Sequence, residues 1–147
     1  MKTSRWLILV LGVGFLIILF GSLLSGGLSG VSRVRRVNGD DPKLTQAIAT
    51  ARAGLPGFLE QVSHPKPGQR FAIMGRFKSK EGNEYLWVKD PTYQSGKLTG
   101  LLDQVPIAVP HHKGDTVTVT TEDVVDWLVR DEDGAMQGRF TEAANHS

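Results

Sequence analysis

The sequence contains no cysteine among its 147 residues, and this absence excludes several classes of protein. Disulfide frameworks, thiol catalysis, zinc ribbons and lipid attachment at a cysteine all require that residue. The chain also lacks a Gly-x-Ser-x-Gly elbow, a phosphate-binding loop, a dinucleotide fingerprint and a His-Glu-x-x-His pair. These absences favour a non-catalytic protein without a cofactor, although catalytic groups that are far apart in sequence leave no such motif.

The basic charge is concentrated near the N-terminus. Five of the seventeen basic residues flank an apolar run, so twelve remain in the rest of the chain against fifteen acids. A nucleic-acid-binding domain carries its excess positive charge on the domain itself. We therefore expect no nucleic-acid partner. The five flanking residues are Lys2, Arg5, Arg33, Arg35 and Arg36.

The apolar run extends from Trp6 to Leu24 without a single charge. As a helix it would span roughly 28 Å, close to the thickness of the hydrocarbon core of a bilayer. It predicts a single-pass transmembrane helix, with residues 1–24 as a membrane anchor. The alternative is a cleaved signal peptide, because small residues suitable for cleavage follow in 25–30. A repeat of Gly21, Ser25 and Ser29 also leaves open a scaffold that dimerises through this helix.

The orientation of this segment is open. Basic residues are more numerous after the run than before it, which favours a cytoplasmic domain. A short basic stub before a long apolar run is nevertheless how an export signal begins. We expect a bacterial inner-membrane protein whose soluble domain lies outside the cytoplasm, with an exported or a cytoplasm-facing domain as the alternatives.

A Gly/Ser/Arg-rich segment, residues 25–39, predicts a flexible linker. Asp41 and Pro42 then predict the start of a helix, because Asp caps helices and Pro suits the first helical position. Apolar residues recur at helical spacing up to position 62, and Pro56 predicts a bend or restart. The members of this stripe are Leu44, Ala47, Ile48, Ala51, Leu55, Phe58, Leu59 and Val62.

The pattern after Gly68 alternates with the period of a half-buried strand. It predicts strands at 71–78, 85–89, 97–102, 114–120, 124–130 and 136–140, with an extended edge piece between Pro106 and Pro110. The Asp133-Gly134 pair is a strong hairpin signal between the last two strands.

The predicted fold class is therefore α+β, with one amphipathic helix followed by a curled sheet of five or six antiparallel strands, a roll or partial barrel. The predicted domain covers residues 40–142, and 143–147 form a disordered tail.

Several motifs follow one another in the order of a known family. They are Asp41-Pro42, Ala51-Arg-Ala-Gly-Leu-Pro-Gly-Phe58, Tyr85-Leu-Trp-Val88, Gly114-Asp-Thr-Val117, Glu122-Asp-Val-Val-Asp-Trp127 and Gly138-Arg-Phe140. Together they resemble the YegJ-like family of bacterial domains of unknown function, over about residues 40–141. The resemblance implies a bacterial source and this domain unit. It implies no reaction, substrate or catalytic residue.

Glu122, Asp123 and Asp126 form the densest acidic group of the chain. Clustered carboxylates suit a hard divalent cation, and a carboxylate pair suits acid–base catalysis. The simpler interpretation is a solvated loop whose acids cap a turn, because no known ligand spacing is present. From 115 to 142 acids outnumber bases by six, whereas from 64 to 113 bases outnumber acids by four. This asymmetry predicts two faces of opposite sign, for docking or for internal pairing.

His111 and His112 are adjacent in a turn, and adjacent side chains rarely ligate one ion. A metal site there would need a further ligand such as His64, so exposed turn histidines are the expectation and no metal site is predicted.

Trp87 and Trp127 are large aromatic residues, which form the core or a recognition surface in a domain of this size. Our main hypothesis is a membrane-anchored, non-catalytic binding module at the cell envelope that recognises an envelope protein or polymer. Its candidate recognition residues are Trp87, Asp123, Asp126 and Trp127. The alternative is a small hydrolase with a carboxylate or metal-assisted site at Glu122, Asp123 and Asp126.

Overall fold

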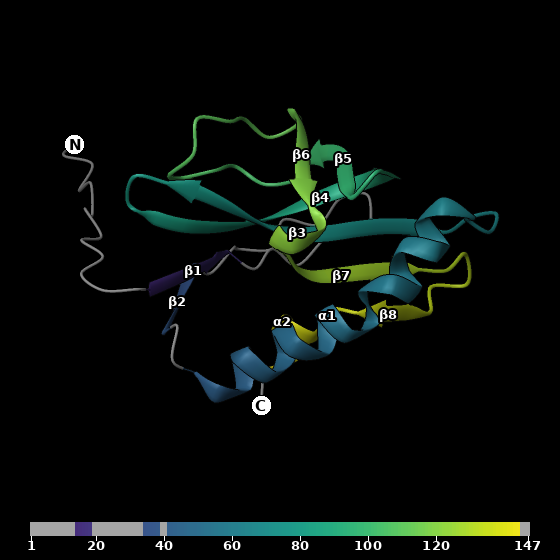
Figure 1. Ribbon diagram of the computed structural model, residues 1–147, viewed down its shortest axis with the longest axis horizontal. Coiled ribbons are helices and arrows are strands. Elements are labelled where there is room, and N and C mark those ends of the chain that lie inside the picture. The colour runs from purple at the N-terminus through teal and green to yellow at the C-terminus, as the bar shows by residue number, and fades with distance from the viewer. Residues whose placement is uncertain (1–13, 19–33, 39–40, 145–147) are drawn as a thin grey trace.

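The computed structural model describes residues 14–18, 34–38 and 41–144. Within 41–144 a long helix, α1, comes first and is followed by six strands and a short helix, α2 (Figure 1). The predicted α+β class is confirmed. The bounds are α1 Pro42–Ser63, β3 Arg70–Ser79, β4 Gly82–Gln94, β5 Lys97–Leu102, β6 Thr116–Thr120, η1 Thr121–Asp123, β7 Val124–Arg130, β8 Met136–Gly138 and α2 Phe140–Ala144.

Helix α1 begins as its sequence predicts. The carboxylate of Asp41 accepts a hydrogen bond from the amide of Lys43 at 2.9 Å, and Pro42 occupies the first turn. The buried face consists of Leu44, Ala47, Ala51, Leu55 and Phe58. Pro56 does not interrupt the helix, which continues as one element to Ser63. The predicted restart is therefore wrong.

The six strands β3 to β8 form an open antiparallel sheet in the order β8–β7–β3–β4–β5–β6. In the described part of the chain, β6 pairs only with β5 and β8 only with β7, so the sheet does not close by hydrogen bonding. The register between β4 and β5 shifts between Lys89 and Thr92, where Asp90 has φ +49°. Such an irregularity bends a strand and increases its twist.

Strands β5 and β6 turn back over the sheet by packing. The core contains Leu98 and Val119 of these strands together with Ile73 of β3 and Phe58 of α1. A methyl group placed at Gly75 of β3 would lie 2.8 Å from the side chain of Val119, so only glycine allows this approach. In the view of Figure 1, β6 runs across β3.

The last predicted strand is shorter than expected. Strand β8 ends at Gly138, and Arg139 has φ +59°, a backbone conformation that extended strands do not adopt. Helix α2 follows directly and includes residues 143 and 144, which we predicted as part of a disordered tail. The rest of that tail, 145–147, lies outside the described residues. The piece between Pro106 and Pro110 is a loop and not an extended strand.

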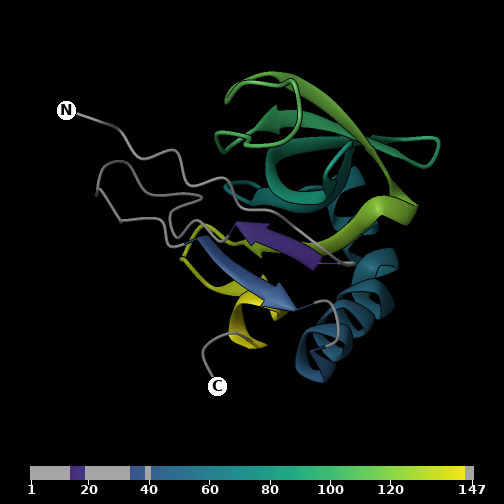
Figure 2. The same cartoon turned by 90° about the vertical axis from the view of Figure 1, so that its left-hand side faces the viewer.

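The predicted transmembrane helix is not confirmed. Gly14–Ile18, inside the predicted span, form strand β1, which pairs antiparallel with β2, Val34–Asn38, and parallel with β4 through two residues (Figure 2). No helix within the described ranges is long and apolar enough to cross a membrane. A short apolar run rich in Ile and Phe suits a strand as well as a helix, so its composition alone does not separate the two. The rest of the span, and residues 25–33 and 39 of the predicted linker, lie outside the described residues.

Candidate functional site

Both candidate tryptophans are buried in the core. Trp87 of β4 is 1% exposed and packs with Met74 and Leu128, whereas Trp127 of β7 is 7% exposed and stacks on Phe58 at a centroid distance of 5.3 Å. The indole nitrogen of Trp127 also donates to the carbonyl oxygen of Ala51 in α1 at 2.7 Å. The two tryptophans belong to separate clusters, so the structure does not bring them together on one surface.

Asp126 is fully buried and holds the start of α2. Its Oδ1 accepts hydrogen bonds from the amides of Trp127 at 2.8 Å and Phe140 at 3.2 Å. Its Oδ2 accepts from the amide of Thr141 at 2.9 Å and the hydroxyl of Thr141 at 2.6 Å. Burial raises the pKa of Asp126, and these hydrogen bonds oppose the rise. This carboxylate therefore acts as a remote cap for α2, whose first amides would otherwise lack acceptors.

The other two acids of the predicted cluster lie in different surroundings. Asp123 accepts two hydrogen bonds from the guanidinium of Arg76, at 2.9 and 2.6 Å. The side chain of Glu122 is exposed, and its backbone carbonyl accepts a hydrogen bond from Arg52 of α1. No group of three acidic or histidine side chains in the described ranges could hold a metal ion. The arrangement thus offers these acids structural contacts and no shared ligand position.

The ion pair of Arg76 and Asp123 borders a buried phenol. Burial raises the pKa of Tyr85 to about 12, while the charge of Arg76 and a hydrogen bond with Asn83 lower it. A phenol with so high a pKa stays protonated at neutral pH and does not serve as a base.

The histidines lie apart from one another. His64 is exposed and contacts Glu60 within the end of α1. His111 and His112 are exposed and both lie near the carboxylate of Asp115, at 3.9 and 3.7 Å. The expectation of exposed turn histidines at 111 and 112 agrees with their positions.

A second buried carboxylate, that of Glu84 in β4, organises the loop between β5 and β6. The amides of three successive loop residues donate to it: Ile107 at 2.7 Å, Ala108 at 2.9 Å and Val109 at 3.2 Å. Gln104 is also buried, and its side-chain oxygen accepts from the amide of Trp87 at 2.7 Å. The β5–β6 loop, residues 103–115, is therefore fixed to the sheet by side chains, although it contains no regular secondary structure.

This ordered loop leaves two aliphatic side chains in solvent. Val105 is 63% and Ile107 is 64% exposed, whereas Val109 is buried. In the hairpin formed by β3 and β4, Lys78 near the end of β3 and Lys80 in the turn are exposed. The loop contacts this hairpin through the rings of Phe77 and His111, whose centroids are 6.3 Å apart, and through the three amides that donate to Glu84.

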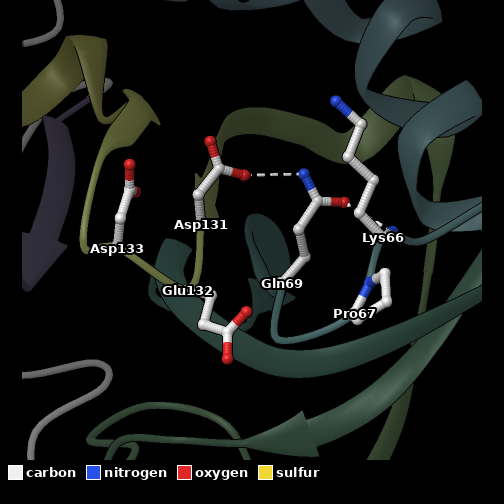
Figure 3. Close-up of a pocket in the computed structure, with 6 residues that line it drawn as sticks. All are labelled: Lys66, Pro67, Gln69, Asp131, Glu132 and Asp133. Carbon is white, nitrogen blue, oxygen red and sulfur yellow. Dashed lines mark hydrogen bonds between the residues drawn. The ribbon is translucent and has the colours of Figure 1, made fainter.

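A pocket of about 420 Å³ lies at the other end of the sheet (Figure 3). It is open to solvent, and its lining residues are Lys66, Pro67, Gln69, Asp131, Glu132 and Asp133. Gln69 donates to Asp131 at 2.7 Å across it. Gly68 has φ +76°, and a Cβ there would lie 2.6 Å from that of Glu132, so glycine permits the close approach of the two loops. The lining has three carboxylates on one turn and the amine of Lys66, and it forms no metal-binding group.

A bacterial family described as "Uncharacterized protein conserved in bacteria (DUF2314)" matches residues 41–145, from the cap of α1 to the residue after α2. The chain belongs to this family. No curated protein and no solved structure matches it. The match confirms the predicted bacterial family of unknown function, while the YegJ-like name is not confirmed.

Sequence reasoning missed Glu84 in this DUF2314 domain. Its signal was a single acid directly before Tyr85-Leu-Trp-Val88, a segment without a charge. A charge beside such a segment must be paired or hydrogen-bonded if it is buried. The identity of its donors could not be read, because they lie more than twenty residues away in a loop.

Proposed function

We propose that this DUF2314 protein is a non-catalytic binding module at the bacterial cell envelope, and that the β5–β6 loop is its interaction surface. The single observation that carries the proposal is the exposure of Val105 and Ile107 on a loop whose backbone is held by buried Glu84. Exposed aliphatic side chains on a pre-ordered backbone bind with little loss of conformational entropy.

This surface differs from the recognition residues that the sequence favoured. Of those four, Trp87, Asp126 and Trp127 are buried, and Asp123 is engaged by Arg76. Their contacts support a role in holding the fold. The hydrolase alternative gains no support from geometry, since Asp123 and Asp126 bind different partners and Glu122 is exposed.

The apolar N-terminal run supports a place at the membrane, where it would act as a single-pass anchor. In that state Gly14–Ile18 would have to leave the sheet, because five residues cannot be in a strand of the domain and in a bilayer-spanning helix together. The contact of β1 with β4 is small, with two residue pairs, Leu16 with Glu84 and Ile17 with Tyr85. Moving Gly14–Ile18 from the sheet into a membrane-spanning helix would therefore break few of the pairings within the domain's own sheet.

The interaction surface can be tested by site-specific crosslinking in intact bacterial cells. The chain has no cysteine, so Ile107→Cys provides a single attachment point for a photoreactive maleimide. The matched control is Glu60→Cys, whose parent side chain at the far end of α1 is 76% exposed. We expect adducts at position 107 and not at position 60. Equal yields at the two positions would refute the assignment of the loop.

The compartment is tested separately with a fusion of alkaline phosphatase after Ser147. This enzyme is active only outside the cytoplasm because it needs disulfides. An active fusion in the membrane fraction supports an anchored, extracytoplasmic domain. An active fusion released from the membrane indicates cleavage, and an inactive, intact fusion places the domain in the cytoplasm.

A further inference from the structure

Strand β6 is an edge of the sheet that pairs on one side only. Directly after it, the amide of Thr121 donates to the carbonyl oxygen of Gly96 at 3.0 Å, beside β5. Alternate residues of an antiparallel strand bond to the same neighbour, so the amides of Thr116, Thr118 and Thr120 point away from β5. In the described part of the chain β6 has no second strand partner. In the view of Figure 2, the light-green ribbon of β6 runs along the outer margin of the molecule.

The edge formed by β6 lacks the features that commonly prevent pairing with a further strand. Thr116–Thr120 contain no charge and no proline, and the pairing of this strand with β5 shows no bulge. The opposite edge, β8, is short: it has three residues and ends at Gly138, directly before the positive φ of Arg139. Of these two edges, β6 therefore offers the longer and more regular one to another strand.

A row of threonines crosses three strands and ends at this edge. Thr92 of β4 is paired with Thr99 of β5, and Thr99 is paired with Thr118 of β6. The hydroxyl of Thr92 donates to the carbonyl oxygen of Thr99 at 3.3 Å, and the hydroxyls of Thr99 and Thr118 are 2.9 Å apart. A hydroxyl both donates and accepts, so one threonine side chain can bond to an identical one across a strand pair. The exposed end of the row, Thr118, is therefore complementary to a second copy of itself.

The charges at the two ends of β6 also suit a second copy of the chain. Antiparallel pairing brings the start of one β6 beside the end of the other, so exposed Lys113 would lie near exposed Glu122 at both ends of the seam. The other acids at these ends are already engaged, because Asp115 accepts an amide of its own loop and Asp123 pairs with Arg76. The remaining charges are opposite in sign and equal in number, which favours a like partner over an anionic or a cationic ligand.

We propose that two copies of the chain join through their β6 strands, antiparallel about a two-fold axis at Thr118, so that the two sheets become one continuous sheet. In this register Thr118 faces Thr118 of the other copy, and Thr116 faces Thr120. The dimer would present two β5–β6 loops, one at each end of the seam. The inference goes beyond the proposed function and is independent of what the loop binds.

Disulfide trapping tests the seam, because the chain has no cysteine of its own. In the proposed dimer the Cα atoms at position 118 are about 5.5 Å apart, a separation that a disulfide spans. Thr116→Cys is the matched control: it is exposed on the same strand and face, but lies roughly 14 Å along the seam from its own copy. With the full chain in a mild detergent and a mild oxidant, we expect Thr118→Cys to crosslink at least about tenfold faster than Thr116→Cys.

Mixing two variants tests the register. Thr116→Cys and Thr120→Cys should each crosslink poorly alone, because neither position faces itself. In a mixture in which one variant carries a tag, we expect a crosslinked heterodimer, because these two positions face each other across the seam. Electrophoresis without reducing agent separates the tagged and untagged products.

A lysine at the two-fold axis tests the same seam without a crosslink. Thr118→Lys places two lysines directly opposite each other, and like charges in that position destabilise a strand pair. Sedimentation velocity of the full chain over a concentration series should show a monomer–dimer equilibrium, with the dissociation constant raised about tenfold or more in Thr118→Lys and much less in Thr116→Lys. Both circular dichroism spectra should match that of the parent, because both threonines are exposed.

Three results would overturn the inference. If Thr118→Cys and Thr116→Cys crosslink equally, the copies meet by random collision and not in this register. If the parent is monomeric at every concentration and Thr118→Cys gives no crosslink, β6 does not pair with a second copy. If the parent forms a dimer that Thr118→Lys leaves intact, the contact lies elsewhere in the chain, such as the apolar N-terminal run.

Discussion

Asp126 and Glu84 are fully buried carboxylates that each hold a neighbouring segment of backbone by hydrogen bonds. The segment held by Asp126 packs into the core, whereas the segment held by Glu84 stays exposed. Glu84 accepts hydrogen bonds from three backbone amides of the β5–β6 loop, and Asp126 accepts them from the first two amides of α2 and from that of Trp127 in its own strand. The segment held by Asp126 brings Phe140 against Trp127, at a centroid distance of 5.4 Å, and completes the core. The segment held by Glu84 keeps Ile107 in solvent. Order without burial is typical of a binding surface, whereas order with burial is typical of a structural closure.

The largest expected effect is at the structural site. Asp126→Ala leaves the amides of Phe140 and Thr141 without their acceptor and should lower the free energy of unfolding by about 3–5 kcal/mol. Chemical denaturation monitored by tryptophan fluorescence measures this loss. The control Asp123→Ala should cost far less, and equal losses for the two variants would contradict the capping role of Asp126.

A smaller loss is expected at the loop. Glu84→Ala removes the acceptor of three amides, of which those of Ile107 and Ala108 are only partly buried and can turn to water. The free energy of unfolding should therefore fall by about 2–4 kcal/mol, less than for Asp126→Ala. The same denaturation experiment ranks the two variants. A larger loss for Glu84→Ala would show that the loop is part of the cooperative core.

The pH dependence distinguishes the Asp126 site further. Because burial raises the pKa of Asp126 above the unfolded value of 3.8, the folded protein binds a proton there more readily than the unfolded chain. The contribution of this residue to the free energy of unfolding should therefore increase as the pH falls through the interval between the raised pKa and 3.8. Denaturation at several pH values, for the parent and for Asp126→Asn, isolates this contribution. A parent-to-variant difference that is independent of pH would contradict it.

The ion pair of Arg76 with Asp123 should contribute less than either buried carboxylate. Both side chains are about one-third exposed, so solvent screens the interaction. We expect Arg76→Ala to change the free energy of unfolding by no more than about 1 kcal/mol. A calorimetric melting curve checks this, and a loss as large as that of Glu84→Ala would assign the pair a structural role.

The smallest effect on stability is expected at the surface itself. Val105→Ser with Ile107→Ser should leave the free energy of unfolding within about 0.5 kcal/mol of the parent, because both side chains are exposed. Thermal melting measures this difference in stability. A destabilised double variant would show that the two residues support the fold.

Much of the fold could be predicted because its signals are local. The capping pair Asp41-Pro42, the helical stripe from Leu44 to Phe58 and the alternation in β6 each depend on neighbouring residues. Helix α2 escaped prediction because its cap is remote: Asp126 lies fourteen residues before Phe140. The positive φ of Arg139, directly after the end of β8, likewise left no signal in the sequence.

The candidate site was harder to predict than the fold. The high density of acids led us to predict a site at residues 122–126. In the structure, however, Asp126 accepts hydrogen bonds from Thr141 and Asp123 pairs with Arg76. Trp87 and Trp127 proved to be core residues, an alternative that the sequence left open. Glu84 and Val105 form no cluster in the sequence. They become parts of one site only when β4 and the β5–β6 loop come together in the folded chain.

Hydrogen exchange of the amides of Ile107, Ala108 and Val109 in the intact chain tests the ordered loop most directly. Exchange at these three positions should be slowed to the range of the β5 and β6 amides in the parent, and accelerated in Glu84→Gln while the amide of Thr141 stays protected. Exchange in the parent as fast as that of an open turn would contradict a pre-ordered binding surface.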